Sequence, residues 1–167
     1  FVDPVGLGQN VAAFMRLGDY DKSLVNSRAW TEPQHIEQRL AELTEHMETV
    51  IQKYLRNQYT NIEEYNQNAP VVEPYRVLVV MDFPVNFNET SARRLVSVAQ
   101  NGPRCGVHTF IVMDTQKPPP YGFSLGDLEQ VSKIVSWDGS CFSWEDPHFS
   151  KCSLALDSPP EDGLFDR

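Results

Sequence analysis

Apolar residues recur at helical spacing after position 31 and predict one long helix. The segment TEPQ starts it, because Thr31 can cap the amide of Gln34 and Pro33 loses no hydrogen bond in the first turn. The pattern continues to about Arg56, so we expect a single amphipathic helix over this range. Its apolar positions are Ile36, Leu40, Leu43, Met47, Val50 or Ile51, and Tyr54.

Apolar residues dominate the segments 75–81 and 107–113, which predicts a strand in each. The first run has no polar alternation, which predicts a strand covered on both faces. Residues 1–5 are expected to end a further buried strand, followed by a turn that contains Gly6 and Gly8. No Gly-Lys-Ser/Thr follows these glycines, so they are interpreted as turn residues rather than as a phosphate-binding loop.

Shorter helices are predicted between these strands. Thr60 and Glu63 have the spacing of a capping box and predict a short helix. Asn88 can cap another helix, which Asn101-Gly-Pro ends. The order strand, helix, strand, helix, strand predicts a mainly parallel α/β sheet flanked by helices. The apolar face of the second short helix consists of Ala92, Leu95, Val96 and Ala99.

The pattern changes after residue 118. A Pro-rich break is followed by a helical turn or two in SLGDLEQV and by a predicted hairpin in IVSWDGSCFSW, where Asp138-Gly139 favours a tight turn. The segment CSLAL can add one more strand, and DSPPEDGLFDR has the composition of a linker. We therefore expect a core at 1–118, a Pro-rich break with a β-hairpin extension at 119–156, and a linker or tail at 157–167.

Composition narrows the classes of protein that fit. The chain has 167 residues, 41% of them hydrophobic, which suits one globular domain. A net charge of −9 argues against a broadly basic nucleic-acid surface. The cysteines Cys105, Cys141 and Cys152 contain no Cys-x-x-Cys spacing, which argues against zinc and predicts a reducing, cytoplasmic setting. No run of about 18 apolar residues is present, so no membrane-spanning segment is expected.

Four segments, taken in order, resemble the motor domain of the FtsK/SpoIIIE branch of RecA-fold DNA translocases. They are FVDPVG, similar to the family's strand ending in Asp-Pro; RNQYTNIEEYN, similar to Arg-Asn-Ile-x-x-Tyr-Asn; PYRVLVVMD, similar to the Walker B strand; and GPRCGVHTFIVMDTQKP, similar to the strand ending in Thr-Gln-Arg-Pro. The resemblance implies a RecA-like (P-loop NTPase-like) core that, in the family, binds ATP between subunits of a ring around DNA. The chain also resembles the ATPase-like segment that precedes the true motor domain in some large proteins of this type.

The resemblance also assigns roles to individual residues. Asp82 matches the Walker B aspartate and could order magnesium through water, while Gln116 matches the residue that senses the terminal phosphate. Arg104 matches a family arginine that can face a neighbouring subunit's nucleotide. Phe83 stands where the family has a second acid, so it cannot polarise the attacking water. The Walker A loop normally precedes the Asp-Pro strand, and this chain does not contain it.

A structural interpretation of these residues stays open beside the nucleotide-binding one. Asp82 can cap the turn that follows its strand, Gln116 can bond loop backbone, and Arg104 can pair with a surface carboxylate. We favour this alternative for the three together, because the amides and lysine that cradle a triphosphate are missing. Phe83 is then expected to fill a hydrophobic space.

Three functional hypotheses follow. The favoured one is a catalytically degenerate module that acts as scaffold or regulator in a larger ATP-driven DNA translocase. It would have no cofactor of its own, its partner would be the rest of its polypeptide or a motor domain in a ring, and DNA would be reached only through the full assembly. The second is part of an active ATPase whose upstream Walker A loop completes a site for ATP and magnesium. The third is a protein-interaction domain that binds through Trp137, Phe142 and Trp144.

Overall fold

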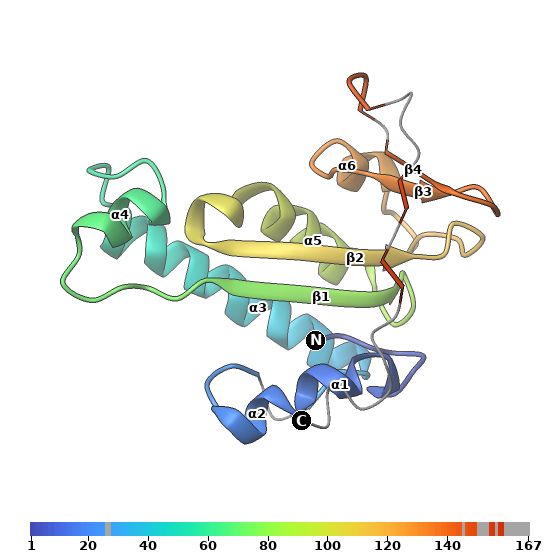
Figure 1. The fold of residues 1–167 in the computed structure, drawn as a ribbon, viewed down its shortest axis with the longest axis horizontal. Helices are drawn as coiled ribbons and strands as arrows, with labels where there is room; N and C mark the ends of the chain where they lie inside the picture. The colour runs from blue at the N-terminus through green and yellow to red at the C-terminus, as the bar shows by residue number, and fades with distance from the viewer. Residues whose placement is uncertain (26–27, 145, 150–153, 156, 159–167) are drawn as a thin grey trace.

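The structure is a computed structural model that describes residues 1–25, 28–144, 146–149, 154–155 and 157–158. Its fold class is mixed α/β, with a small parallel sheet, several helices and a separate hairpin (Figure 1). The strands are β1 (Arg76–Phe83), β2 (Val107–Met113), β3 (Val135–Trp137) and β4 (Phe142–Trp144). The helices are η1 (Gln9–Val11), α1 (Ala12–Met15), α2 (Leu17–Tyr20), α3 (Pro33–Thr49), η2 (Val50–Leu55), α4 (Ile62–Asn68), α5 (Glu89–Asn101), η3 (Pro103–Cys105) and α6 (Leu125–Glu129).

Strands β1 and β2 pair in parallel, and two shorter segments extend the arrangement beyond β1. Val2 forms parallel bridges with both Val80 of β1 and Trp30. The amide of Val2 donates to the carbonyl of Val79 at 2.8 Å, and the amide of Asp3 donates to the carbonyl of Trp30 at 3.0 Å. The parallel order is therefore Trp30, Val2, β1, β2. The buried strand expected at 1–5 is limited to this bridge at Val2.

Helices α3 and α5 cover one face of the sheet and lie behind β1 and β2 in Figure 1. Buried side chains of both helices pack against Val80 in the largest hydrophobic cluster, which also includes Phe123 and Leu128 from the segment after β2. A second cluster joins the end of α3 and η2 to α4 and the start of β2. The core thus lies between the helices and a single face of the sheet.

The predicted ends of the main elements agree with the structure to within about two residues. Strand β2 occupies the expected range, and β1 is shifted to Arg76–Phe83. Helix α3 begins at Pro33 and continues as the π-helical turn η2 to Leu55, so the long helix predicted up to about Arg56 is confirmed. Asn88 caps α5 in a capping box with Ser91, and the helix ends at Asn101 as predicted.

Two predicted caps are wrong. The residue before α3 is Glu32, and no side chain caps this helix, so Thr31 does not have the expected role. At α4 the capping residue is Asn61, whose Oδ1 accepts a hydrogen bond from the amide of Glu64 at 3.0 Å. Glu64 in turn accepts from the amide of Thr60 at 2.7 Å. The cap therefore lies one residue further along than predicted, and Glu64 accepts from the amide of Thr60 rather than from that of the capping residue Asn61.

The expectation that β1 is covered on both faces is also wrong. Val77 in β1 is 57% exposed, and Phe110 in β2 is 63% exposed. Inward-facing residues such as Val80 and Val107 are buried against the helices. An unbroken apolar run shows that a strand can be buried, but only its neighbours decide whether it is.

The region after β2 contains the predicted short helix, as α6, and the predicted hairpin of β3 and β4. The amide of Asp138 donates to the carbonyl of Cys141 at 3.2 Å, so the turn centres on Gly139 and Ser140 rather than on Asp138-Gly139. Gly139 has φ 99°, a left-handed value that suits glycine. Most of CSLAL and of the 157–167 tail lies outside the described residues, although Leu154 forms an antiparallel bridge with Phe142.

None of the helices in the described ranges is long and apolar enough to cross a bilayer.

Candidate functional site

The two strands separate the three residues expected to touch nucleotide. Because β1 and β2 are parallel, Asp82 at the end of β1 and Gln116 after β2 both lie at the carboxyl edge of the sheet. Arg104 lies in η3, before β2, and therefore at the amino edge. The seven residues of β2 span about 23 Å, so Arg104 does not share a site with the other two residues within this chain.

Asp82 occupies an irregular position where β1 ends. The pairing register with β2 shifts between Val80 and Phe83, and Asp82 has φ 55°. Its main-chain carbonyl accepts a hydrogen bond from the amide of Val85 at 3.0 Å and closes the following turn. Oδ2 of Asp82 is buried and has no hydrogen-bond partner. The turn is thus closed by the main chain of Asp82, and its carboxylate is not the cap.

The glycine turn beside this edge is organised by Asp3, a fully buried residue. The carboxylate of Asp3 accepts hydrogen bonds from the main-chain amides of Gly6 at 3.0 Å, Gly8 at 2.9 Å and Asn10 at 3.1 Å. Nδ2 of Asn10 adds a fourth bond at 3.0 Å. These amides face an internal anion, so the turn does not offer them to a phosphate.

Gln116 lies in the exposed turn that follows β2. Its main-chain amide donates to Oδ1 of Asp114 at 3.0 Å, and Asp114 also lies 3.9 Å from Nζ of Lys117. The main chain of Gln116 is thereby held at the carboxyl edge, while its side chain forms no hydrogen bond to another described residue. The carboxyl edge therefore presents Asp82, Asp114 and Gln116 around one end of the sheet.

Phe83 points away from that edge and into the core. Its side chain is fully buried, with its ring centroid 5.0 Å from Phe87 and 6.2 Å from Phe123, both edge-to-face. The expectation that Phe83 fills a hydrophobic space is therefore confirmed. An acid at this position would be buried among aromatic rings and would not face a nucleotide.

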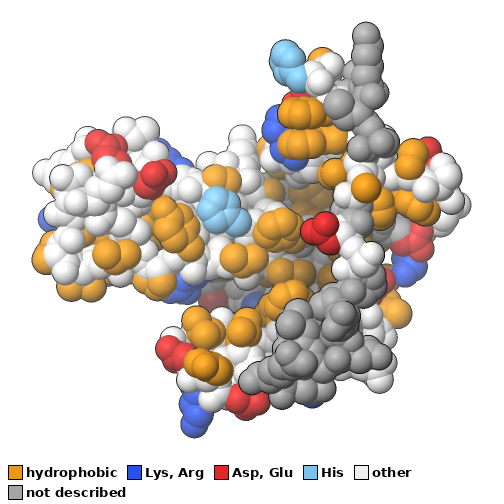
Figure 2. Space-filling model, viewed as in Figure 1, with side chains coloured by type: hydrophobic (Ala, Val, Ile, Leu, Met, Phe, Trp, Pro, Cys, Tyr) orange, Lys and Arg blue, Asp and Glu red, His pale blue; other side chains and the backbone are white. Residues whose placement is uncertain are grey.

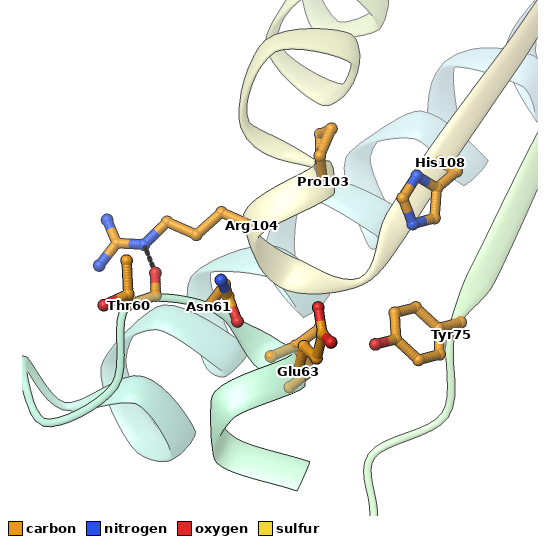
Figure 3. A pocket seen from close by; sticks show the side chains of 8 residues that line it. Thr60, Asn61, Glu63, Tyr75, Pro103, Arg104 and His108 are labelled. Carbon is orange, nitrogen blue, oxygen red and sulfur yellow. Dashed lines mark hydrogen bonds between the residues drawn. The ribbon is translucent and has the colours of Figure 1, made fainter. Parts of the chain in front are cut away.

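Arg104 lies at an open pocket on the amino edge, shown in Figure 3. Its Nε donates to the carbonyl of Thr60 at 2.8 Å, and this bond ties η3 to the loop before α4. The expected pairing of Arg104 with a surface carboxylate does not occur among the described residues. The guanidinium is instead positioned by backbone, with its terminal nitrogens directed outward (Figure 3).

The pocket has a volume of about 860 Å³. Tyr75 and His108, which enter it from the starts of β1 and β2, stack with ring centroids 6.0 Å apart. The sequence pattern did not predict this pair, because only the pairing of the strands brings Tyr75 and His108 together. The remaining residues that line the pocket are Thr60, Asn61, Ile62, Glu63 and Pro103.

The three aromatic residues proposed as an interface share one face of the hairpin. Trp137 and Phe142 are directly opposite each other, with ring centroids 4.6 Å apart, and Trp144 follows two residues later on the same side. Trp137 is 56% exposed, whereas Trp144 stacks on Phe149 at 5.0 Å. Hydrogen bonds from the amides of Cys141 and then Ser140 lower the pKa of Asp138 and keep a negative charge at the turn.

ATP and magnesium do not fit the described residues as a complete site. The amides of the glycine turn are engaged by Asp3, and Phe83 is buried where the second acid would stand. In the described part of the chain, no group of three or more His, Cys, Asp or Glu side chains could hold a metal ion. Among the residues that the structure describes, Asp82 is the carboxylate that keeps a buried oxygen without a hydrogen-bond partner.

A scan against protein-family models finds no match, and searches of curated proteins and of solved structures find no significant match either.

Proposed function

We propose that this chain is a catalytically inactive, RecA-like module that serves as scaffold or regulator within a larger ATP-driven DNA translocase. The parallel order Trp30, Val2, β1, β2 supports a RecA-like sheet, because it places the Asp-Pro, Walker B-like and Thr-Gln segments side by side. The partner would be a motor domain, or the rest of the same polypeptide, within a ring. DNA would be contacted through the assembled complex.

The burial of Phe83 is the observation that carries this proposal. A residue that polarises the attacking water must face the nucleotide, but Phe83 lies wholly within the core between Phe87 and Phe123. The glycine turn adds to this argument, since its amides bind the carboxylate of Asp3. Phe83 therefore supplies no group that polarises the attacking water, and the glycine turn supplies no free amides for phosphate.

Calorimetric titration of the chain with ATP and magnesium tests the proposal. We expect no saturable heat, and the same trace for Asp82→Asn as for the wild-type chain. Micromolar binding that Asp82→Asn weakens would overturn the proposal, because it would show that Asp82 and the carboxyl edge hold Mg-ATP unaided.

One observation favours a second candidate, an active ATPase completed by a phosphate-binding loop elsewhere in the polypeptide. Oδ2 of Asp82 is buried at the carboxyl edge without a partner, as a carboxylate awaiting a cation would be. DNA-stimulated hydrolysis by the full-length polypeptide, abolished by Asp82→Asn, would favour this candidate over the scaffold. Hydrolysis that Asp82→Asn leaves unchanged would place the catalytic centre in another domain.

The aromatic hairpin stays a proposed protein interface. Trp137 carries this proposal through its 56% exposure, since large aromatic side chains are frequent anchors of interfaces. Replacing Trp137, Phe142 and Trp144 together should remove a partner or an oligomeric contact of the full-length protein. If every such contact survives the triple substitution, the hairpin is not the interface.

A further inference from the structure

The pocket at the amino edge of the sheet contains an aromatic pair and a carboxylate. Tyr75 and His108 stack with ring centroids 6.0 Å apart and 27° between the ring planes, and Glu63 lines the same pocket from the first turn of α4. The carboxylate of Glu63 and the hydroxyl of Tyr75 are directed toward each other (Figure 3). Figure 2 shows a histidine and neighbouring hydrophobic side chains over the start of β2, with acidic side chains close by over α4.

Local packing and hydrogen bonds fix both sides of this pocket. A Cβ at Gly106 would lie 2.9 Å from Cγ2 of Ile62 and 3.3 Å from Cδ1 of Tyr75, so the tyrosine ring is packed closely between the two strands and α4. The cap by Asn61, whose Oδ1 accepts from the amide of Glu64 at 3.0 Å, fixes the first turn of α4. The site is therefore formed before any ligand arrives.

The negative charge of Glu63 is not neutralised by its neighbours. Within the described residues Glu63 forms neither a hydrogen bond nor an ion pair. Nε of Arg104 donates to the carbonyl of Thr60 at 2.8 Å, which turns the guanidinium away from the aromatic pair (Figure 3). Arg76 lies 3.8 Å from Glu73 instead. The space between Glu63 and the two rings is thus bounded by an anion and by aromatic surface.

We infer that this pocket binds an arginine side chain of a partner protein. A guanidinium is planar, so it can lie against the ring of Tyr75, which is 54% exposed, while it donates two parallel hydrogen bonds to the carboxylate of Glu63. The ammonium of lysine carries the same charge but cannot form this paired contact. A volume of about 860 Å³ admits the arginine together with the residues that flank it.

An anionic ligand fits the pocket less well than a cation. Its charge would face the carboxylate of Glu63, and Arg104 is directed elsewhere. The net charge of −9 on the whole chain also attracts cations and repels anions. The inference does not depend on the proposed scaffold function, because it uses only the geometry and charge of this pocket.

The test uses three capped tripeptides that differ only in the central side chain: acetyl-Gly-Arg-Gly-amide and its lysine and citrulline versions. Two-dimensional amide NMR of the isotope-labelled chain follows each titration. We expect the arginine peptide to cause saturable shifts of the amide signals of the pocket residues. The lysine peptide should bind about threefold more weakly, since it loses the paired hydrogen bonds. The citrulline peptide has nearly the same shape without the charge and should not saturate.

Variants of the pocket separate its two contributions. Glu63→Gln should weaken binding of the arginine peptide by about fivefold, as expected for a partly exposed ion pair. Tyr75→Ala should weaken it by about threefold through loss of the ring, whereas Tyr75→Phe should bind as the wild-type chain does. Circular dichroism checks that each variant folds. Glu129→Gln, at an exposed site in α6, makes the same change of net charge outside the pocket and should leave binding unchanged.

Four results would overturn the inference. They are the absence of saturable shifts with the arginine peptide, equal binding of the citrulline peptide, unchanged binding by Glu63→Gln, and equal weakening by Glu129→Gln and Glu63→Gln. The last result would mean that the net charge of the chain attracts the peptide and that the pocket does not. Tighter binding of acetyl-Gly-Glu-Gly-amide than of the arginine peptide would also overturn it, because the pocket would then select anions.

Discussion

Oδ2 of Asp3 accepts a hydrogen bond from the main-chain amide of Gly8 at 2.9 Å. The glycine turn therefore folds around a carboxylate that belongs to the chain itself. A turn rich in glycine can bind phosphate only when its amides are free, and here Gly6, Gly8 and Asn10 are all engaged. The role of Asp3 is to hold the first turn against the sheet edge.

Replacing Asp3 should destabilise the fold strongly. In Asp3→Asn the amide group must turn its NH2 toward main-chain donors, so at least one of the four hydrogen bonds to Asp3 is lost without replacement. We expect the free energy of unfolding to fall by about 3 kcal/mol in urea denaturation. Asp127→Asn, at an exposed site in α6, is the control and should change it by less than about 0.5 kcal/mol. A loss below about 1 kcal/mol for Asp3→Asn would contradict this role.

Restoring an acid after Asp82 should harm the protein rather than activate it. Phe83→Glu places a carboxylate among Phe87 and Phe123, where it has no partner, so we expect a loss of more than about 3 kcal/mol in unfolding free energy. Phe83→Leu keeps an apolar side chain and should cost about 1.5 kcal/mol. Thermal and urea denaturation measure both. A stable Phe83→Glu protein that hydrolyses ATP would show that this position faces a nucleotide.

The structure and the sequence pattern assign the cap of α4 to different residues. Asn61→Ala removes the acceptor for the amide of Glu64 and should lower the free energy of unfolding by about 1 kcal/mol. Thr60→Ala should have almost no effect, since the main chain of Thr60, not its hydroxyl, bonds Glu64 and Arg104. Urea denaturation of the two variants measures the difference. The opposite ranking would restore Thr60 as the cap.

His46 should make stability depend on pH. Burial, and then the positive charge of Arg76, lower the pKa of His46 below 6.5, and Glu73 opposes this only in part. The unfolded chain therefore takes up a proton at this histidine before the folded chain does, so stability falls as pH drops through the unfolded pKa. The contribution is absent above that value, where His46 is neutral in both states.

Comparison with His46→Gln isolates this effect. The free energy of unfolding, measured in urea at pH 7 and pH 5, should fall more for the wild-type chain than for His46→Gln. Other titrating groups are common to both proteins and cancel in the difference. An equal or larger fall in the variant would mean that His46 is not held neutral by its surroundings.

The sequence predicted the ends of a helix or strand well where neighbouring residues determine them. Asn88 caps α5 and Asn101-Gly-Pro follows its last turn, because both effects act within a few residues of the helix end. The range of β2 likewise follows from its own β-branched and apolar residues. The cap of α4 was misplaced by one residue because Thr60 and Asn61 both favour capping, and the choice between them depends on the path of the loop.

The candidate site was predicted only in part. Asp82 and Gln116 do lie at one edge of the sheet, as follows from two parallel strands that each end near them. The resemblance assigned Arg104 to a neighbouring subunit's nucleotide, and the structure places it across the sheet from Asp82 and Gln116, at the pocket with Tyr75 and His108. The signal for Asp3 was present as an aspartate before a Gly-x-Gly turn, a spacing at which a carboxylate can reach several amides.

The amino-acid sequence by itself determined the ranges of α3, α5, β1 and β2 and the parallel pairing of the two long strands, but it did not predict the short helices η1, α1 and α2. Helix periodicity, capping and strand propensity act between neighbouring residues, so the printed order of residues is enough to predict them. Only the tertiary structure decided that Asp3 fills the glycine turn, that Phe83 faces the core, and that Val77 and Phe110 remain exposed. Those outcomes depend on what packs against each side chain from distant parts of the chain, and burial is a property of that packing.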